Sequence, residues 1–173
     1  EAEARLEYFY RTLERLTAVV GDGAVSDGGP VVAPADKTLD LFREAMDDDF
    51  NTAAAIGQLY EAFVLANKLL DDAKSAPKDV RRRTLARLRA DLGACGRTLG
   101  ILSREPAAFL AARRDRLCLR RGIDAAAVET RIGERTAARA NKDFARADEI
   151  RQELRARGIE LMDAPGGTSW RVV

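Results

Sequence analysis

The sequence contains no histidine and only two cysteines, Cys95 and Cys118, among its 173 residues. Without histidine, the chain has neither a Ser-His-Asp or Cys-His nucleophile system nor an imidazole general base. Two cysteines without histidine partners do not supply the ligands of a zinc site, so we expect no metal-ligating residues. Cys95 falls on an apolar helical stripe, which predicts a small core residue rather than a nucleophile.

Long apolar runs are missing as well. No stretch approaches the ~20 apolar residues of a membrane span, and no signal peptide is visible. Two lone cysteines form no disulfide framework, which favours a reducing compartment. We therefore expect a cytoplasmic protein with no membrane partner. The chain starts with Glu1 rather than Met, which predicts a piece of a longer protein.

Aromatic residues make up only 6% of the chain, and 31 of its apolar residues are Ala. Large side chains are therefore sparse, which suits a bundle of closely spaced helices. The high content of Ala, Arg, Leu and Glu favours helix as the main secondary structure.

The net charge of +1 conceals an uneven distribution of charge along the chain. Residues 1–76 carry 7 basic and 15 acidic side chains, whereas residues 77–173 carry 22 basic and 13 acidic side chains. Most basic residues are Arg, which suits planar contacts with phosphates and bases. This asymmetry points to nucleic acid, although a biased genomic base composition would also raise both Arg and Ala.

The spacing of apolar residues predicts four helices in the first part of the chain, over residues 1–20, 37–47, 52–72 and 77–102. We expect Asp36 to cap the second helix, and Asn51 or Asp49 to cap the third. The stretch 21–34 is rich in Gly, Asp and Pro, which predicts a surface loop.

The second part of the chain has a different pattern. It predicts a short basic helix from Pro106 to about Arg121, and then helices over 125–140 and 144–157 that begin after Asp124 and Asp143. Two strands follow, over 159–163 and 168–173, with a turn at 164–167. The fold class is therefore mainly α: an antiparallel helical bundle (1–103), a linker helix (104–122) and a small α+β module with a C-terminal β-hairpin (123–173).

The acidic triplet 47–49 is one candidate for chemistry. Magnesium normally takes one or two carboxylates together with waters and substrate phosphates. No Gly-rich phosphate loop follows a strand anywhere in the sequence. We therefore expect the triplet to form a capping and turn segment between two helices.

The stretch from Arg131 to Arg171 interleaves basic side chains with Phe144 and Trp170. This pattern suits single-stranded nucleic acid, because phosphates bind Arg and unstacked bases bind aromatic faces. Carboxylates such as Asp148 and Asp163 accept hydrogen bonds from base edges. Two alternatives remain open: Phe144 extends a helical stripe and could belong to the core, and Trp170 could be a hydrophobic lid on the last helix.

Three segments resemble cysteinyl-tRNA synthetases. MDDDFNTAA (46–54) is similar to the LDDDFNTPAA segment of that family, with Ala53 in place of Pro. RTAARANKDFARADEIR (135–151) and GIELMDAPGGTSWR (158–171) resemble two segments near the end of the family's sequence. The segments occur in the family's order, whereas residues 74–122 match only in character.

The resemblance implies a helical bundle followed by a module that binds the anticodon of cysteine tRNA. It assigns anticodon reading to Arg139, Phe144, Asp148 and Asp163, with Trp170 and Arg171 carried over as motif positions. The family's catalytic signature and zinc ligands need His, so this chain is expected to hold no catalytic residue. ATP and zinc are expected in a catalytic domain of the parent enzyme, which is expected to be monomeric. The alternatives are the related cysteine ligase of mycothiol synthesis and a non-catalytic, Arg-rich protein-interaction module.

Overall fold

The computed structural model describes residues 2–21, 28–164 and 167–173. The chain forms two compact units, Glu1–Leu110 and Ala111–Val173. Helices make up most of both, and the predicted mainly α class with a C-terminal hairpin is confirmed. The finer division at residues 103 and 122 stays a prediction. Residues 22–27 of the predicted loop and residues 165–166 of the predicted turn lie outside the described residues.

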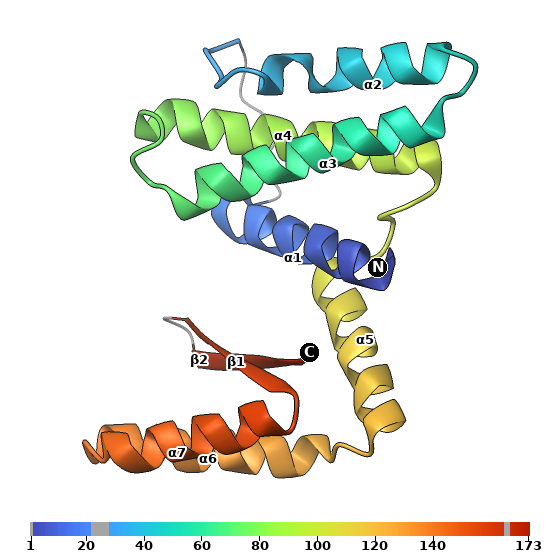
Figure 1. The fold of residues 1–173 in the computed structure, drawn as a ribbon. Helices are drawn as coiled ribbons and strands as arrows, with labels where there is room; N and C mark the ends of the chain where they lie inside the picture. Colours follow the sequence, from blue (N-terminus) through green and yellow to red (C-terminus); the bar gives the residue numbers. More distant parts are fainter. Residues whose placement is uncertain (1, 22–27, 165–166) are drawn as a thin grey trace. The chain divides into compact units, whose positions relative to one another are not determined.

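Four long helices build the first unit: α1 (Ala2–Val20), α2 (Thr38–Asp47), α3 (Thr52–Asp71) and α4 (Lys78–Leu99). A short 3₁₀ helix, η1 (Ala35–Lys37), precedes α2. Helices α3 and α4 form the middle layer, with α2 on one side and α1 on the other (Figure 1). The predicted four-helix bundle is therefore confirmed in its helices, whose ends shift by a few residues at most.

Sparse large side chains fill the core of the bundle, as the composition predicts. The rings of Phe9 and Phe63 stack with their centroids 4.3 Å apart. Leucines from α1, α3 and α4 surround this pair and are almost fully buried: Leu16, Leu59, Leu69, Leu85, Leu88 and Leu92. Each buried leucine contributes about 1.5–3 kcal/mol relative to an exposed one, so these side chains hold the layers together.

The acidic triplet forms the corner between α2 and α3. Asp49 and Phe50 both have a φ of 53°, in the left-handed region. The side chain of Asn51 accepts a hydrogen bond from the backbone N–H of Ala54 (3.0 Å), so Asn51 is the cap of α3. The prediction that Asp36 caps α2 is wrong, because Asp36 lies inside η1 and Lys37 occupies the cap position.

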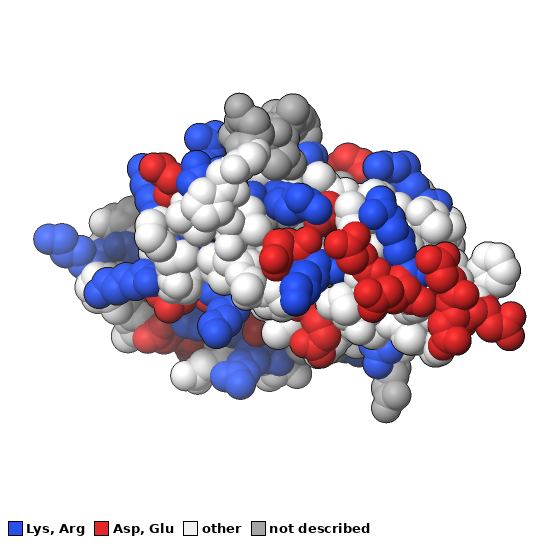
Figure 2. Space-filling view, turned by 90° about the horizontal axis from the view of Figure 1, so that it is seen from above, with Lys and Arg blue, Asp and Glu red and all other residues white. Residues whose placement is uncertain are grey.

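Charge on the bundle is mixed rather than uniformly acidic. Figure 2 shows the face on the α2 side, where acidic side chains gather toward one end and basic side chains are spread among them. Charged side chains of the bundle also pair with each other, as Arg43 does with Asp40 across one helical turn of α2. The negative charge of residues 1–76 is therefore partly neutralised on the surface of the bundle.

The second unit packs helices against a two-stranded sheet. It contains most of α5 (Pro106–Arg121), followed by α6 (Ala125–Ala140), α7 (Phe144–Ala156), β1 (Ile159–Ala164) and β2 (Gly167–Val172). The strands are antiparallel, and Asp163 pairs with Thr168 while Leu161 pairs with Trp170. One face of the hairpin is buried with the apolar sides of α6 and α7: Val128, Ile132, Ile150, Leu154, Ile159, Leu161, Trp170 and Val172.

The ends of these elements follow the predicted signals. Asp124 accepts from the backbone N–H groups of Ala126 and Ala127, and Asp143 accepts from that of Arg146. These contacts satisfy amide groups that have no partner inside the helix. Gly122 ends α5 with a φ of 63°, a conformation that suits glycine. Local capping chemistry therefore sets where α5 ends and where α6 and α7 begin.

Candidate nucleic-acid interface

Asp163, near the end of β1, is hydrogen-bonded by the buried side chain of Arg135 of α6. The two Nη atoms of Arg135 donate to the two carboxylate oxygens of Asp163, each at 2.8 Å. The hydroxyl of Thr168, the partner of Asp163 across the hairpin, donates to Asp163 Oδ1 at 2.7 Å. The hydrogen bonds from Arg135 and Thr168 hold the pKa of the Asp163 carboxyl well below its usual range. Asp163 is therefore a fixed, ionised acceptor.

Arg139 lies one helical turn after Arg135 and faces the same carboxylate. Its Nη1 is 3.6 Å from Oδ2 of Asp163. The side chain of Arg135 is only 3% exposed, whereas the side chains of Arg139 and Asp163 are 53% and 45% exposed. The surface thus presents a guanidinium donor next to a carboxylate acceptor. Base edges offer acceptors and donors in similar pairs, so this combination is suited to hydrogen bonding with a base.

Phe144 and Asp148 lie one turn apart at the start of α7. Phe144 is 61% exposed, and Asp143 caps the helix directly before it. The residues that face the core are Ala147, Ile150 and Leu154, so the alternative that placed Phe144 in the core is wrong. The exposed ring is free to stack on a planar ligand.

Asp148 adds a second exposed carboxylate. The Asp163 hydrogen bond is the main cause that raises the pKa of Arg135, and the charge of Asp148 also raises it. The charge of Asp148 therefore favours the charged form of the buried guanidinium. Together, Arg139, Asp163, Asp148 and Phe144 supply one cation, two anions and one ring, all at least partly exposed.

Trp170 lies two residues after Thr168 on β2, but its indole is buried. Trp170 is 5% exposed, and its Nε1 donates to Glu129 of α6 at 2.7 Å. The guanidinium of Arg114 covers the ring at 4.9 Å from its centroid. This environment favours the alternative in which Trp170 packs as a lid on the helices over direct stacking on a base.

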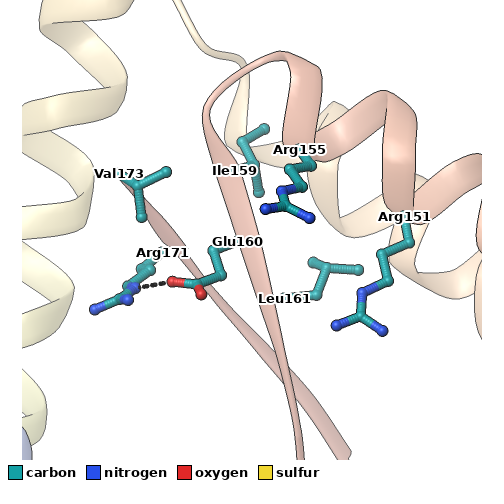
Figure 3. Close-up of a pocket in the computed structure, with 7 residues that line it drawn as sticks. All are labelled: Arg151, Arg155, Ile159, Glu160, Leu161, Arg171 and Val173. Atoms are coloured by element: carbon teal, nitrogen blue, oxygen red, sulfur yellow. Dashed lines mark hydrogen bonds and ion pairs between the residues drawn. The ribbon is translucent and has the colours of Figure 1, made fainter.

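Arg171 extends from the opposite face of β2. Its Nε donates to the carboxylate of Glu160, its neighbour on β1 (Figure 3). The hairpin therefore separates the predicted residues: Asp163 and Trp170 are on the face that packs on the helices, and Arg171 is on the other face.

Two residues of this cluster were not predicted as site residues. Arg135 opens the motif 135–151, and its position four residues before Arg139 places both on one face of α6. Thr168 is the first residue after the Gly pair of the turn, which places it opposite Asp163 in a tight hairpin. The spacing in the motifs therefore indicated that Arg135 shares a helix face with Arg139 and that Thr168 lies opposite Asp163.

Metal ligation, membrane insertion and cysteine reactivity are the other features on which the sequence bears. Within 2–21, 28–164 and 167–173, no group of three or more Cys, Asp or Glu side chains is placed to hold a metal ion. In the same part of the chain, no helix is both long and apolar enough to cross a membrane. Cys95 and Cys118 are both buried, and burial raises the pKa of the Cys95 thiol to about 11.

Two family models match the chain. Residues 41–103 match the DALR domain, and residues 124–171 match the cysteinyl-tRNA ligase anticodon binding domain. The first match begins within α2 and extends past the end of α4, and the second covers α6, α7 and nearly all of the hairpin. The cluster of Arg135, Arg139, Asp148 and Asp163 lies entirely inside the second match.

Curated relatives align with almost the whole chain. The chain is 47% identical over 174 residues to a cysteine–tRNA ligase of Anaeromyxobacter sp. (strain Fw109-5), an alignment that covers 99% of this chain and 34% of the relative. It is 43% identical over 176 residues to a cysteine–tRNA ligase of Geobacter metallireducens, with 99% of this chain and 36% of the relative covered. The chain thus spans about a third of the length of the relatives that it matches.

Proposed function

Because the chain belongs to the cysteinyl-tRNA ligase family, we propose that its second unit recognises the anticodon of cysteine tRNA. The observation that carries this proposal is the exposed Arg139–Asp163 pair beside Phe144 and Asp148. These groups lie within the matched anticodon binding domain. Their chemistry suits unstacked bases in a loop, which are read on their edges and faces.

Each residue has a distinct role in this proposal. Phe144 stacks on a splayed base, while Asp148 and Asp163 accept hydrogen bonds from exocyclic amines or ring N–H groups. Arg139 donates to base oxygens or ring nitrogens. Trp170 supports the hairpin from inside, and Arg171 pairs with Glu160 on its outer face.

The activity of the parent enzyme is part of the same proposal. It would join cysteine to its tRNA with ATP, as a monomer in the cytoplasm, and would hold zinc in its catalytic domain. The described residues offer no metal-binding cluster, and the chain has no His. In this proposal the chain binds and orients the tRNA, and we assign no step of the ligation reaction to it.

The two alternatives have less support. A protein-interaction module needs no exposed ring beside paired donors and acceptors, and the match over 124–171 supports a tRNA-binding module instead. The same match disfavours the mycothiol cysteine ligase, which is expected to lack this module.

Titration with RNA tests the proposal. The chain is titrated with the anticodon stem-loop of cysteine tRNA and with a stem-loop of the same length that carries substituted anticodon bases. We expect weaker binding of the substituted RNA, and loss of most of this difference in Arg139→Ala and Asp148→Ala. Arg116→Ala, which removes an exposed Arg of α5, is the matched control and should keep the difference. Equal binding of the two RNAs by the unaltered chain would exclude anticodon reading.

A further inference from the structure

A groove in the second unit lies between the C-terminal half of α7 and the hairpin. Its volume is about 370 Å³. Arg151 and Arg155 extend from α7 over β1, where the buried side chains of Ile159 and Leu161 form part of its lining (Figure 3). None of the residues assigned above to base reading lines this groove.

The groove has an excess of positive charge. Arg171, also in its lining, pairs with Glu160. Arg151 and Arg155 are exposed, and within the described part of the chain neither guanidinium has a carboxylate partner. Two guanidinium groups without a carboxylate partner are suited to the phosphate groups of a nucleic-acid strand.

The groove is continuous with the face of α7 that carries Phe144 and Asp148. Phe144, Asp148, Arg151 and Arg155 are separated by four, three and four residues, so they share one face of the helix. Along this face, a ring and a carboxylate are followed by two guanidinium groups. The 11 steps from Phe144 to Arg155 span ~16 Å at 1.5 Å per residue. This length corresponds to about five stacked nucleotides at ~3.4 Å each.

We infer that this groove is a backbone-binding site in which Arg151 and Arg155 contact phosphodiester groups of an RNA strand whose bases contact the Phe144 end of α7. This inference rests on the proposed function and adds phosphate contacts by Arg151 and Arg155, two residues to which the family resemblance assigns no role. An extended strand suits the site better than an isolated anion, since Phe144 and Asp148 lie on the same face of α7 as the two guanidinium groups. Arg151 and Arg155 supply affinity, and the Phe144 end supplies base selectivity.

The test compares Arg151→Gln/Arg155→Gln with the unaltered chain and with Arg157→Gln. Arg157 lies just after α7 and is exposed; at 100° per residue it is turned well away from the face of Arg151 and Arg155. Binding of the cysteine tRNA stem-loop and of its anticodon-substituted counterpart is measured across a series of salt concentrations. Fluorescence of Trp170 verifies that each variant is folded.

For the double variant we expect affinity for both RNAs to fall roughly tenfold at low salt, with their ratio unchanged. The slope of log affinity against log salt should decrease by about 0.7 for each phosphate contact removed. Unchanged affinity and slope in the double variant, or an equal loss in Arg157→Gln, would overturn the inference even if the anticodon is read. A third outcome is that the double variant loses affinity and salt dependence, while the unaltered chain binds both RNAs equally. This outcome would support the groove as a phosphate-binding site and exclude the proposed anticodon recognition. No stem-loop binding by the unaltered chain at low salt would overturn both.

Discussion

The buried guanidinium of Arg135 holds the half-exposed carboxylate of Asp163 through two parallel hydrogen bonds of 2.8 Å. Arg135 comes from the middle of α6 and Asp163 from the end of β1, so the pair joins the helices to the hairpin. Its bidentate geometry leaves the carboxylate little rotational freedom. Arg135 is thus a positioning residue, since it sets the orientation of Asp163 next to Arg139.

Replacing Asp163 by Asn should destabilise the second unit by about 2 kcal/mol. The substitution leaves the buried charge of Arg135 with a weaker, neutral acceptor. The cost is smaller than for a fully buried pair, because the Asp163 side chain is 45% exposed. Urea unfolding followed by the fluorescence of Trp170, the one tryptophan in the sequence, measures it. Asp148→Asn is the matched control and should change stability by less than about 0.5 kcal/mol; similar effects of the two substitutions would contradict this role for the ion pair.

The stability of the second unit should fall in acid, and Asp163 should account for part of the fall. The pKa of Asp163 is held well below its usual value by the hydrogen bonds from Arg135 and Thr168. Such a carboxyl contributes stability that is present above the unfolded-state pKa, about 4, and is lost as pH falls toward the folded-state pKa. The difference in unfolding free energy between the unaltered chain and Asp163→Asn should therefore narrow below about pH 4. A difference that stays constant from pH 6 to pH 2.5 would exclude this linkage.

Phe144→Ala should weaken binding of the cysteine tRNA stem-loop about tenfold or more, since stacking of one base on an aromatic ring contributes about 1–3 kcal/mol. Phe144→Trp should keep or strengthen binding, because indole offers a larger face. Phe144 is exposed, so neither variant should shift the urea midpoint reported by Trp170. Full RNA affinity in Phe144→Ala would exclude the stacking role.

Cys95 should resist thiol reagents in the folded chain. Burial is the main cause that raises its pKa to about 11, which leaves roughly one thiolate in a thousand at pH 8. Labelling with iodoacetamide in Cys118→Ala, followed by mass spectrometry, isolates this thiol. We expect slow labelling without urea and fast labelling in urea. Rapid modification under native conditions would show that the bundle core opens around Cys95.

Much of the fold could be predicted from local signals in the sequence. Asn51, Asp124 and Asp143 each occupy a cap position that their side chains and neighbours indicate. The wrong prediction that Asp36 caps α2 has a local cause as well, because the 3₁₀ helix η1 continues past Asp36 to Lys37. Hydrophobic periodicity and helix capping depend on residues that are close in sequence, so both can be predicted from a single sequence.

The arrangement of the site was less predictable, because it depends on contacts between distant residues. Arg135 lies 28 residues from Asp163, and no spacing rule predicts the hydrogen bonds between these two side chains. The hairpin brings the indole of Trp170 within hydrogen-bonding distance of Glu129, which favours one of the two alternatives that the sequence left open for Trp170. The groove beside Arg151 also needs α7 and both strands together. The motifs thus indicated candidate site residues, and the packing determines which of them are exposed.

The corner between α2 and α3 has a consequence for the bundle as a folding unit. Asp49 and Phe50 both occupy the left-handed region, which costs a residue with a side chain about 1 kcal/mol or more. The ring of Phe50 is 76% exposed, so little packing offsets this strain. Glycine would adopt the same conformation freely. The bundle therefore holds backbone strain at this corner that a glycine at position 50 would relieve.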